Sequence, residues 1–137
     1  MRTRFFVLGA VGALASTPIA AHHSAAAHYD VAQTVSISGV VQEFRYTNPH
    51  AVVRVTAKNQ RGVEEVWSVE WAPTTILRRL GVKPESIKAG DRVTATGNPA
   101  RDGSHDLLMQ QLTFADGRPP IGGGGPGIPG GRNDNAQ

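Results

Sequence analysis

The chain has 137 residues, with 14 lysines and arginines against 11 aspartates and glutamates, for a formal net charge of +3. This length provides the core of one small domain and excludes a two-domain enzyme with a cleft between its domains. The absence of cysteine excludes disulfides, zinc–thiolate sites and thiol catalysis.

Residues 1–21 have the organisation of a secretory signal peptide. Arg2 and Arg4 form a positive start, an apolar stretch of about eleven residues follows, and small residues lead to Ala21. This stretch is too short to span a bilayer, so we expect an exported chain, periplasmic or secreted, without a transmembrane segment after cleavage. Loss of the two arginines leaves 12 basic against 11 acidic residues, which argues against nucleic acid as a partner.

From residue 31 onward the sequence alternates apolar and polar residues with the period of β-strands. We predict strands over residues 31–45, 50–58 and 63–71. Asn48-Pro49 forms the first turn, because a residue before proline is disfavoured in a helix. Gly39, inside the first strand, predicts a bulge or a sharp bend there.

A short helix is predicted after Pro73, because apolar residues recur at helical spacing as far as Gly81, a residue type that suits the end of a helix. Two more strands are predicted over residues 92–97 and 105–114. Strict alternation in the last strand would place its residues on two faces: Leu108, Gln110, Leu112 and Phe114 against Leu107, Met109 and Gln111.

The order of three strands, one helix and a hairpin predicts an all-β domain with one short helix, a five-stranded OB-like β-barrel over residues 22–115. An SH3-like barrel and an open antiparallel sheet are the alternatives. Residues 116–137 are rich in glycine and proline and poor in residues that could be buried. We therefore expect a disordered tail over this range.

Six phrases occur along the chain in a recognisable order: Ala21-His22-His23-Ser24, Thr47-Asn48-Pro49-His50, Trp67-Ser68-Val69-Glu70, Leu77-Arg78-Arg79-Leu80-Gly81, Lys88-Ala89-Gly90-Asp91-Arg92-Val93 and Gly97-Asn98-Pro99-Ala100-Arg101-Asp102-Gly103-Ser104. Taken together, they resemble the DUF6152 family of small exported bacterial proteins. The resemblance implies an exported β domain of OB-like character. It implies no activity, because the family is one of unknown function.

The strongest chemical feature is the N-terminus that cleavage creates. If His22 comes first, its amine and imidazole can chelate one metal ion, and another histidine can complete the site. If cleavage falls one residue earlier, His23 becomes the third residue and can bind through its imidazole, two amide nitrogens and the amine. Such nitrogen ligands suit Cu(II). The candidates for a distal ligand are His28, His50 and His105, and His50 is preferred because it follows the Asn-Pro turn.

Weaker candidates for a ligand-binding face are Asn48, Trp67, Glu70, Trp71 and His105. We expect at least one tryptophan to belong to the core. Glu70 is the carboxylate of most interest, because it can lie beside His50 and orient its ring through a hydrogen bond, or bind metal itself.

Together these observations predict a non-enzymatic exported domain that binds a small ligand, with Cu(II) as the candidate cofactor at His22, His23 and His50. The alternative is a protein-interaction module of the cell envelope that works without metal and uses the barrel face or a strand edge.

Overall fold

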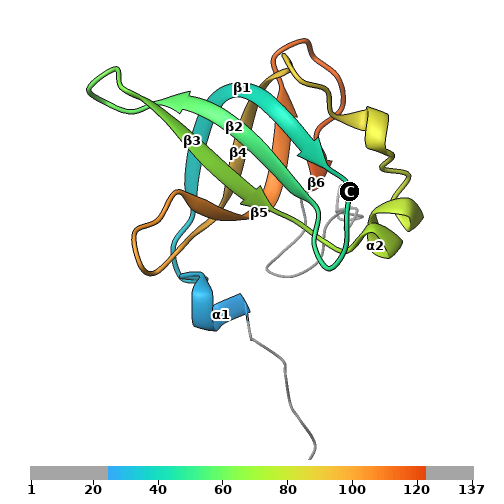
Figure 1. Ribbon diagram of the computed structural model, residues 1–137, viewed down its shortest axis with the longest axis horizontal. Coiled ribbons are helices and arrows are strands. Elements are labelled where there is room, and N and C mark those ends of the chain that lie inside the picture. The colour runs from blue at the N-terminus through green and yellow to red at the C-terminus, as the bar shows by residue number, and fades with distance from the viewer. Residues whose placement is uncertain (1–24, 123–137) are drawn as a thin grey trace, which may run out of the picture.

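In the computed structural model, residues 25–122 are described, and strands dominate this range (Figure 1). None of the helices in this range has the length and hydropathy needed to cross a membrane. The elements in chain order are α1 (Ala25–His28), β1 (Val35–Arg45), β2 (Val52–Lys58), β3 (Glu64–Glu70), α2 (Thr74–Arg79), the 3-10 turn η1 (Pro84–Ser86), β4 (Arg92–Pro99), β5 (Asp106–Phe114) and β6 (Ile121–Gly122).

Five of these strands form a closed barrel. The long strand β1 pairs with β4 through its first half and with β2 through its second half, both antiparallel. Strand β3 pairs antiparallel with β2, β4 pairs antiparallel with β5, and a parallel contact between β3 and β5 closes the barrel. The barrel prediction is therefore confirmed, and the open-sheet alternative does not apply. The OB-like name rests on the predicted order of strands and helix.

Gly39 lies where β1 pairs with both of its neighbours, opposite Ala57 of β2 and Val93 of β4. A Cβ atom at this position would lie 2.1 Å from the carbonyl oxygen of Thr56. The close approach of β1 to the backbone of β2 at this point thus depends on a residue without a side chain. The register shift in the pairing of β1 with β2 falls slightly later, between Val41 and Glu43.

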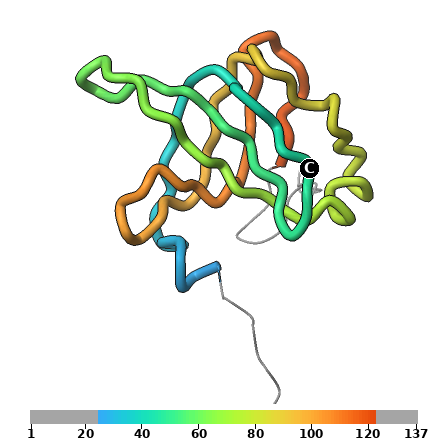
Figure 2. Tube along the Cα trace, viewed as in Figure 1, coloured from blue at the N-terminus to red at the C-terminus, as the bar shows by residue number. Residues whose placement is uncertain are grey.

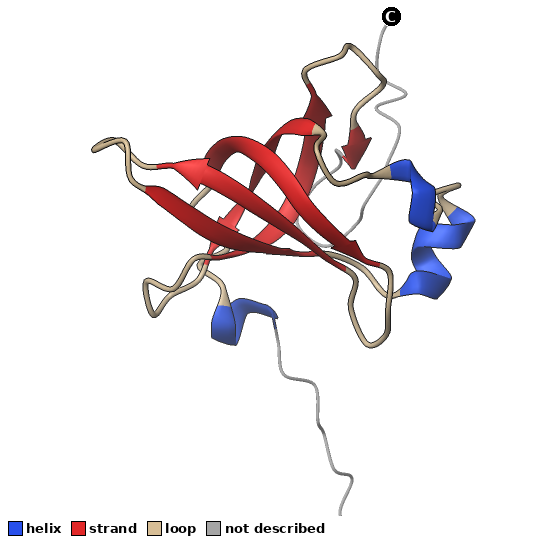
Figure 3. Ribbon diagram, turned by 45° about the horizontal axis from the view of Figure 1, so that its top comes forward, coloured by secondary structure: helices blue, strands red, loops and turns tan. Residues whose placement is uncertain are grey.

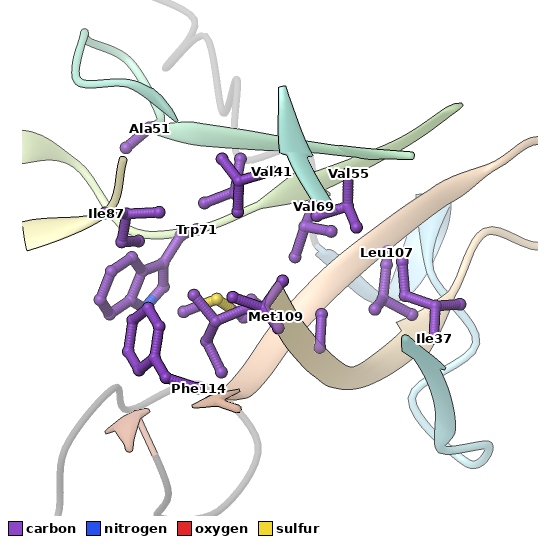
Figure 4. Close-up of a cluster of buried hydrophobic side chains, with 14 of the residues drawn as sticks. Ile37, Val41, Ala51, Val55, Val69, Trp71, Ile87, Leu107, Met109 and Phe114 are labelled. Atoms are coloured by element: carbon purple, nitrogen blue, oxygen red, sulfur yellow. The ribbon is translucent and has the colours of Figure 1, made fainter. Parts of the chain in front are cut away.

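The barrel interior is filled by the apolar residues that the alternation of β1 and β2 predicts (Figure 4). Val41, Val53 and Val55 are almost fully buried, whereas the intervening polar residues face outward. Leu77 of α2 is also fully buried. Helix α2 and the turn η1 lie near each other at one end of the molecule, away from α1 (Figure 3).

Strict alternation is wrong for β5. Four apolar residues of β5 are buried: Leu107, Met109, Leu112 and Phe114. The first two are odd-numbered and the last two are even-numbered, so strict alternation would place the two pairs on opposite faces. The pairing with β4 explains this, because Thr96 lies opposite Gln111 and the next residue, Gly97, lies opposite Met109. Gln110 is thus an extra residue in β5, and such a bulge switches the face of every residue beyond it.

Other differences from the prediction lie at the ends of the domain. The elements α1 and η1 were not predicted, so the described chain has two short α-helices rather than one. The tail predicted from residue 116 begins too early, because Ile121 and Gly122 form β6 against Gln111 and Leu112 of β5. Ile121 is half-buried against the core. The predictions for residues 1–24 and 123–137 lie outside the described residues.

Arg118, which lies within the predicted tail, connects the loop before β6 to the barrel. Its guanidinium lies 4.0 Å from the centre of the Phe114 ring and 2.9 Å from the carboxylate of Asp91, and it donates to the Ser86 carbonyl at 3.3 Å. Partial burial raises the pKa of Asp91. Hydrogen bonds from Arg118 and from the Lys88 backbone, together with both positive charges, outweigh this effect and hold the pKa below its usual value.

We expect Asp91→Asn to destabilise the fold at neutral pH but not in acid. Because the pKa of Asp91 is lower in the folded state, its ionised form stabilises the fold. This contribution is complete above the pKa of an unfolded aspartate, about 3.9, and is lost as the pH falls through the lower folded value. Urea unfolding at a series of pH values measures it. A gap between wild type and variant that stays constant from pH 6 to pH 2 would contradict the assignment.

Candidate functional site

The segment that precedes β1, residues 25–33, is docked against the loop between β4 and β5 (Figure 2). Tyr29 forms an antiparallel bridge with Ala100. The backbone N–H of Arg101 donates to the His28 carbonyl at 2.9 Å, and its guanidinium donates to a further carbonyl of α1 at 2.9 Å. We call residues 25–33 the N-terminal segment. Its backbone bonds fix it to the barrel. The sequence pattern assigns no regular structure to residues 25–30 and places residues 31–33 in the first predicted strand, whereas β1 begins only at Val35.

Three side chains form a chain of contacts between this segment and the barrel. The Tyr29 hydroxyl donates to Oε2 of Glu70 at 2.7 Å, and Nδ1 of His50 lies 2.6 Å from Oε1 of the same carboxylate. Glu70 ends β3 and lies opposite Val52, the first residue of β2, which explains why it reaches His50, two residues before that strand. The predicted proximity of His50 and Glu70 is therefore present in the structure.

Burial differs strongly along this chain of contacts. Tyr29 is 4% exposed, whereas the His50 side chain is 49% exposed. Burial, followed by the hydrogen bond to Glu70 and its charge, raises the pKa of the Tyr29 hydroxyl far above its usual value. Tyr29 is thus a hydrogen-bond donor throughout the neutral pH range. Because Nδ1 of His50 is directed at Glu70, Nε2 is the ring nitrogen that remains for a ligand.

A second histidine contacts a different carboxylate of β3. The His105 ring stacks on Trp67 with ring centres 4.8 Å apart, and its Nε2 lies 3.5 Å from Oε2 of Glu65. The Asn59 amide donates to the other oxygen of Glu65 at 2.6 Å. His105 therefore belongs to its own cluster, and the contacts of the structure do not join it to His50.

Two of the residues predicted for a ligand-binding face have structural roles. Trp71 is 3% exposed and lies in the core (Figure 4), in agreement with the expectation that at least one tryptophan is a core residue. Oδ1 of Asn48 accepts hydrogen bonds from the Thr74 backbone at 3.2 Å and from the Thr74 hydroxyl at 2.9 Å. It thereby fixes the first residue of α2 to the turn that carries His50.

The predicted metal ligands His22 and His23 lie outside the described residues. Within residues 25–122, no three histidine, aspartate or glutamate side chains converge as a metal ion requires.

Sequence reasoning missed Tyr29. The residue follows α1 in a segment with no strand or helix period, and its partner Glu70 lies 41 positions away. The available signal was a large amphipathic side chain beside His28, whose ring packs edge-on against that of Tyr29 at 4.6 Å.

The family model described as "Family of unknown function (DUF6152)" matches residues 11–109. The chain therefore belongs to this family, as the resemblance implied, and the match includes Tyr29, His50 and Glu70. Comparison with curated proteins and with solved structures finds no match.

Proposed function

We propose that this chain is an exported protein that binds Cu(II) through His50 together with His22 and His23 at the processed N-terminus. The observation that carries the proposal is the contact of 2.6 Å between Nδ1 of His50 and Glu70. Glu70 is itself fixed by the Tyr29 hydroxyl at 2.7 Å.

This arrangement is the one that metal-binding histidines commonly have. A ligating imidazole usually donates its second ring N–H to a carboxylate or carbonyl, which fixes the ring and increases the basicity of the ligating nitrogen. His50 has this support from Glu70, and half of its side chain is open to solvent. Imidazole and amine nitrogens are ligands that favour Cu(II) among the divalent metals.

The position of the N-terminal segment supports the choice of partners for His50. Two residues separate His22 from Ala25, the first residue of α1, so the covalent chain keeps their Cα atoms within about 11 Å of each other. The docked segment in turn ties α1 to Tyr29, which contacts the partner of His50. A short tether of this kind gives the terminal histidines a high effective concentration near the barrel.

The proposed role is binding, such as metal buffering, transport or sensing, rather than catalysis. The three side chains of the contact chain hold one another, with Tyr29 as donor and the carboxylate as acceptor. This arrangement suits the orientation of a ligating imidazole more than proton transfer to a substrate.

Copper titration of protein that begins at His22 tests the proposal. We expect His50→Ala to weaken Cu(II) binding by at least about 10-fold, measured by competition with a chelator of known affinity. His105→Ala is the matched control, because its side chain is similarly exposed, at 45%, and also faces a glutamate of β3. Acetylating the amine of His22 should weaken binding as well, because it removes the amine nitrogen from the chelate.

Two results would contradict the proposal. One is an affinity of the whole protein no higher than that of a short peptide that begins His-His-Ser. The other is equal binding by wild type and His50→Ala.

The interaction module is the second candidate function, and the first half of β3 favours it. The pairing of β3 with β5 covers Ser68 to Glu70, so the strand edge before Ser68 lies beyond this contact. Val63 and Val66 are exposed there by 56% and 37%. A partner strand could add to this edge. Failure of the copper titration would favour this candidate.

A further inference from the structure

We infer that Tyr29 is the positioning residue of the proposed metal site and that it couples binding at His50 to docking of the N-terminal segment. This inference rests on the proposed function, which supplies the ligand. Its first test, however, needs no metal.

The geometry around Glu70 assigns different tasks to its two carboxylate oxygens. Oε2 accepts from the Tyr29 hydroxyl at 2.7 Å, and Oε1 lies 2.6 Å from Nδ1 of His50. A carboxylate held at one oxygen presents the other in a fixed direction, whereas a carboxylate held only by an exposed histidine can rotate. The Tyr29 hydroxyl therefore determines where the acceptor for His50 lies.

Tyr29 is the rigid member of this chain of contacts. Its ring is buried, and the backbone is fixed on both sides, by Arg101 N–H to the His28 carbonyl at 2.9 Å and by Asp30 N–H to the Pro99 carbonyl at 2.8 Å. The hydroxyl can thus reach Glu70 when the N-terminal segment is docked. Docking of the segment, orientation of Glu70 and orientation of His50 are three linked steps.

Linkage makes this effect reciprocal. If the docked segment favours metal binding at His50, metal binding must favour the docked segment by the same factor. Cu(II) is therefore expected to stabilise residues 25–33 more than the barrel core.

Tyr29→Phe tests the inference, because it keeps the ring and removes the hydroxyl. In metal-free protein at pH 8, we expect ¹⁵N NMR of the His50 imidazole to show a proton mainly on Nδ1 in wild type. In the variant we expect a larger share of the other tautomer. With Cu(II), we expect about 10-fold weaker binding and an altered copper EPR spectrum. Neither spectroscopic change would follow from loosened packing alone.

Tyr46→Phe is the matched control. The Tyr46 hydroxyl donates to the carbonyls of Thr74 and Val82 at 3.2 and 3.0 Å, on the side of α2. This variant loses a comparable hydroxyl without touching Glu70, so it should leave the tautomer of His50 unchanged. An equal tautomer shift in both variants would overturn the positioning role.

A measurement on wild type keeps the inference testable if Tyr29→Phe does not fold. Hydrogen exchange in residues 25–33 should slow by about 10-fold on Cu(II) binding, the factor that linkage requires. Unchanged exchange in copper-bound protein would overturn the coupling and leave the proposed function standing. A wild type that binds no copper would overturn the proposed function, while the tautomer experiment would still decide whether Tyr29 positions His50.

Discussion

Replacing Gly39 by alanine should lower the free energy of unfolding by about 3 kcal/mol. The new Cβ atom would lie 2.1 Å from the carbonyl oxygen of Thr56 and 2.9 Å from a methyl group of Val55. The oxygen belongs to the backbone of β2, which pairs with β1 at this point, so it cannot move without disturbing the ladder. Urea unfolding monitored by tryptophan fluorescence measures the change.

Gly103→Ala is the control for this substitution. Gly103 has a φ of +79°, but a Cβ atom there would have no neighbour within 4 Å. The cost should therefore be limited to the left-handed backbone conformation, about 1 kcal/mol. Equal losses in the two variants would show that Gly39 does not lie at a close approach of two strands.

Leu112→Ala should destabilise the protein by about 2–5 kcal/mol, whereas Leu108→Ala should cost less than about 1 kcal/mol. The two leucines have the same parity in β5, and strict alternation would make them equivalent. The bulge at Gln110 separates them, because Leu112 is fully buried in the core and Leu108 is partly exposed. The same urea unfolding experiment compares the two variants directly.

The opposite ranking of these variants would contradict the bulge. Leu107→Ala provides a further comparison. Leu107 is fully buried, although its odd number would place it on the opposite face from Leu108 and Leu112 under strict alternation. If the bulge is present, Leu107→Ala and Leu112→Ala should have similar effects, and each should exceed that of Leu108→Ala.

Much of the fold could be predicted because β1 and β2 bury one face and expose the other. Val41, Val53 and Val55 follow a strict period of two, and each is buried. Gly81 ends the predicted helix with a φ of +76°, as expected of a residue after a helix end. In β5 the period is interrupted at Gln110, and a template of strict alternation has no place for an extra residue.

The ends of the domain were harder to predict because their contacts are made with distant residues rather than by local pattern. Ile121 and Arg118 lie in a sequence rich in glycine and proline, which favours disorder. Ile121 is held by its pairing with β5, and Arg118 is held by the carboxylate of Asp91. Neither partner can be recognised from the local sequence.

The candidate site was predicted in part for the same reason. His50 lies two residues before β2, and Glu70 is the last residue of β3. The register of the β2–β3 hairpin therefore brings them together once the two strands are recognised. Tyr29 reaches Glu70 through a backbone bridge to Ala100, and no periodic pattern indicates that bridge. The terminal ligands His22 and His23 remain a prediction from cleavage chemistry.

The way in which the barrel closes has a consequence for folding kinetics. Val35 pairs with Gly97 and Ser68 pairs with Asp106, so closure joins residues separated by about 60 and about 40 positions. Contacts of such long range require large loops to close before they contribute any stabilisation, and domains dominated by them fold in milliseconds to seconds. The valine-rich strands β1 and β2 are therefore exposed to other chains during folding for much longer than a helical bundle of this size would be.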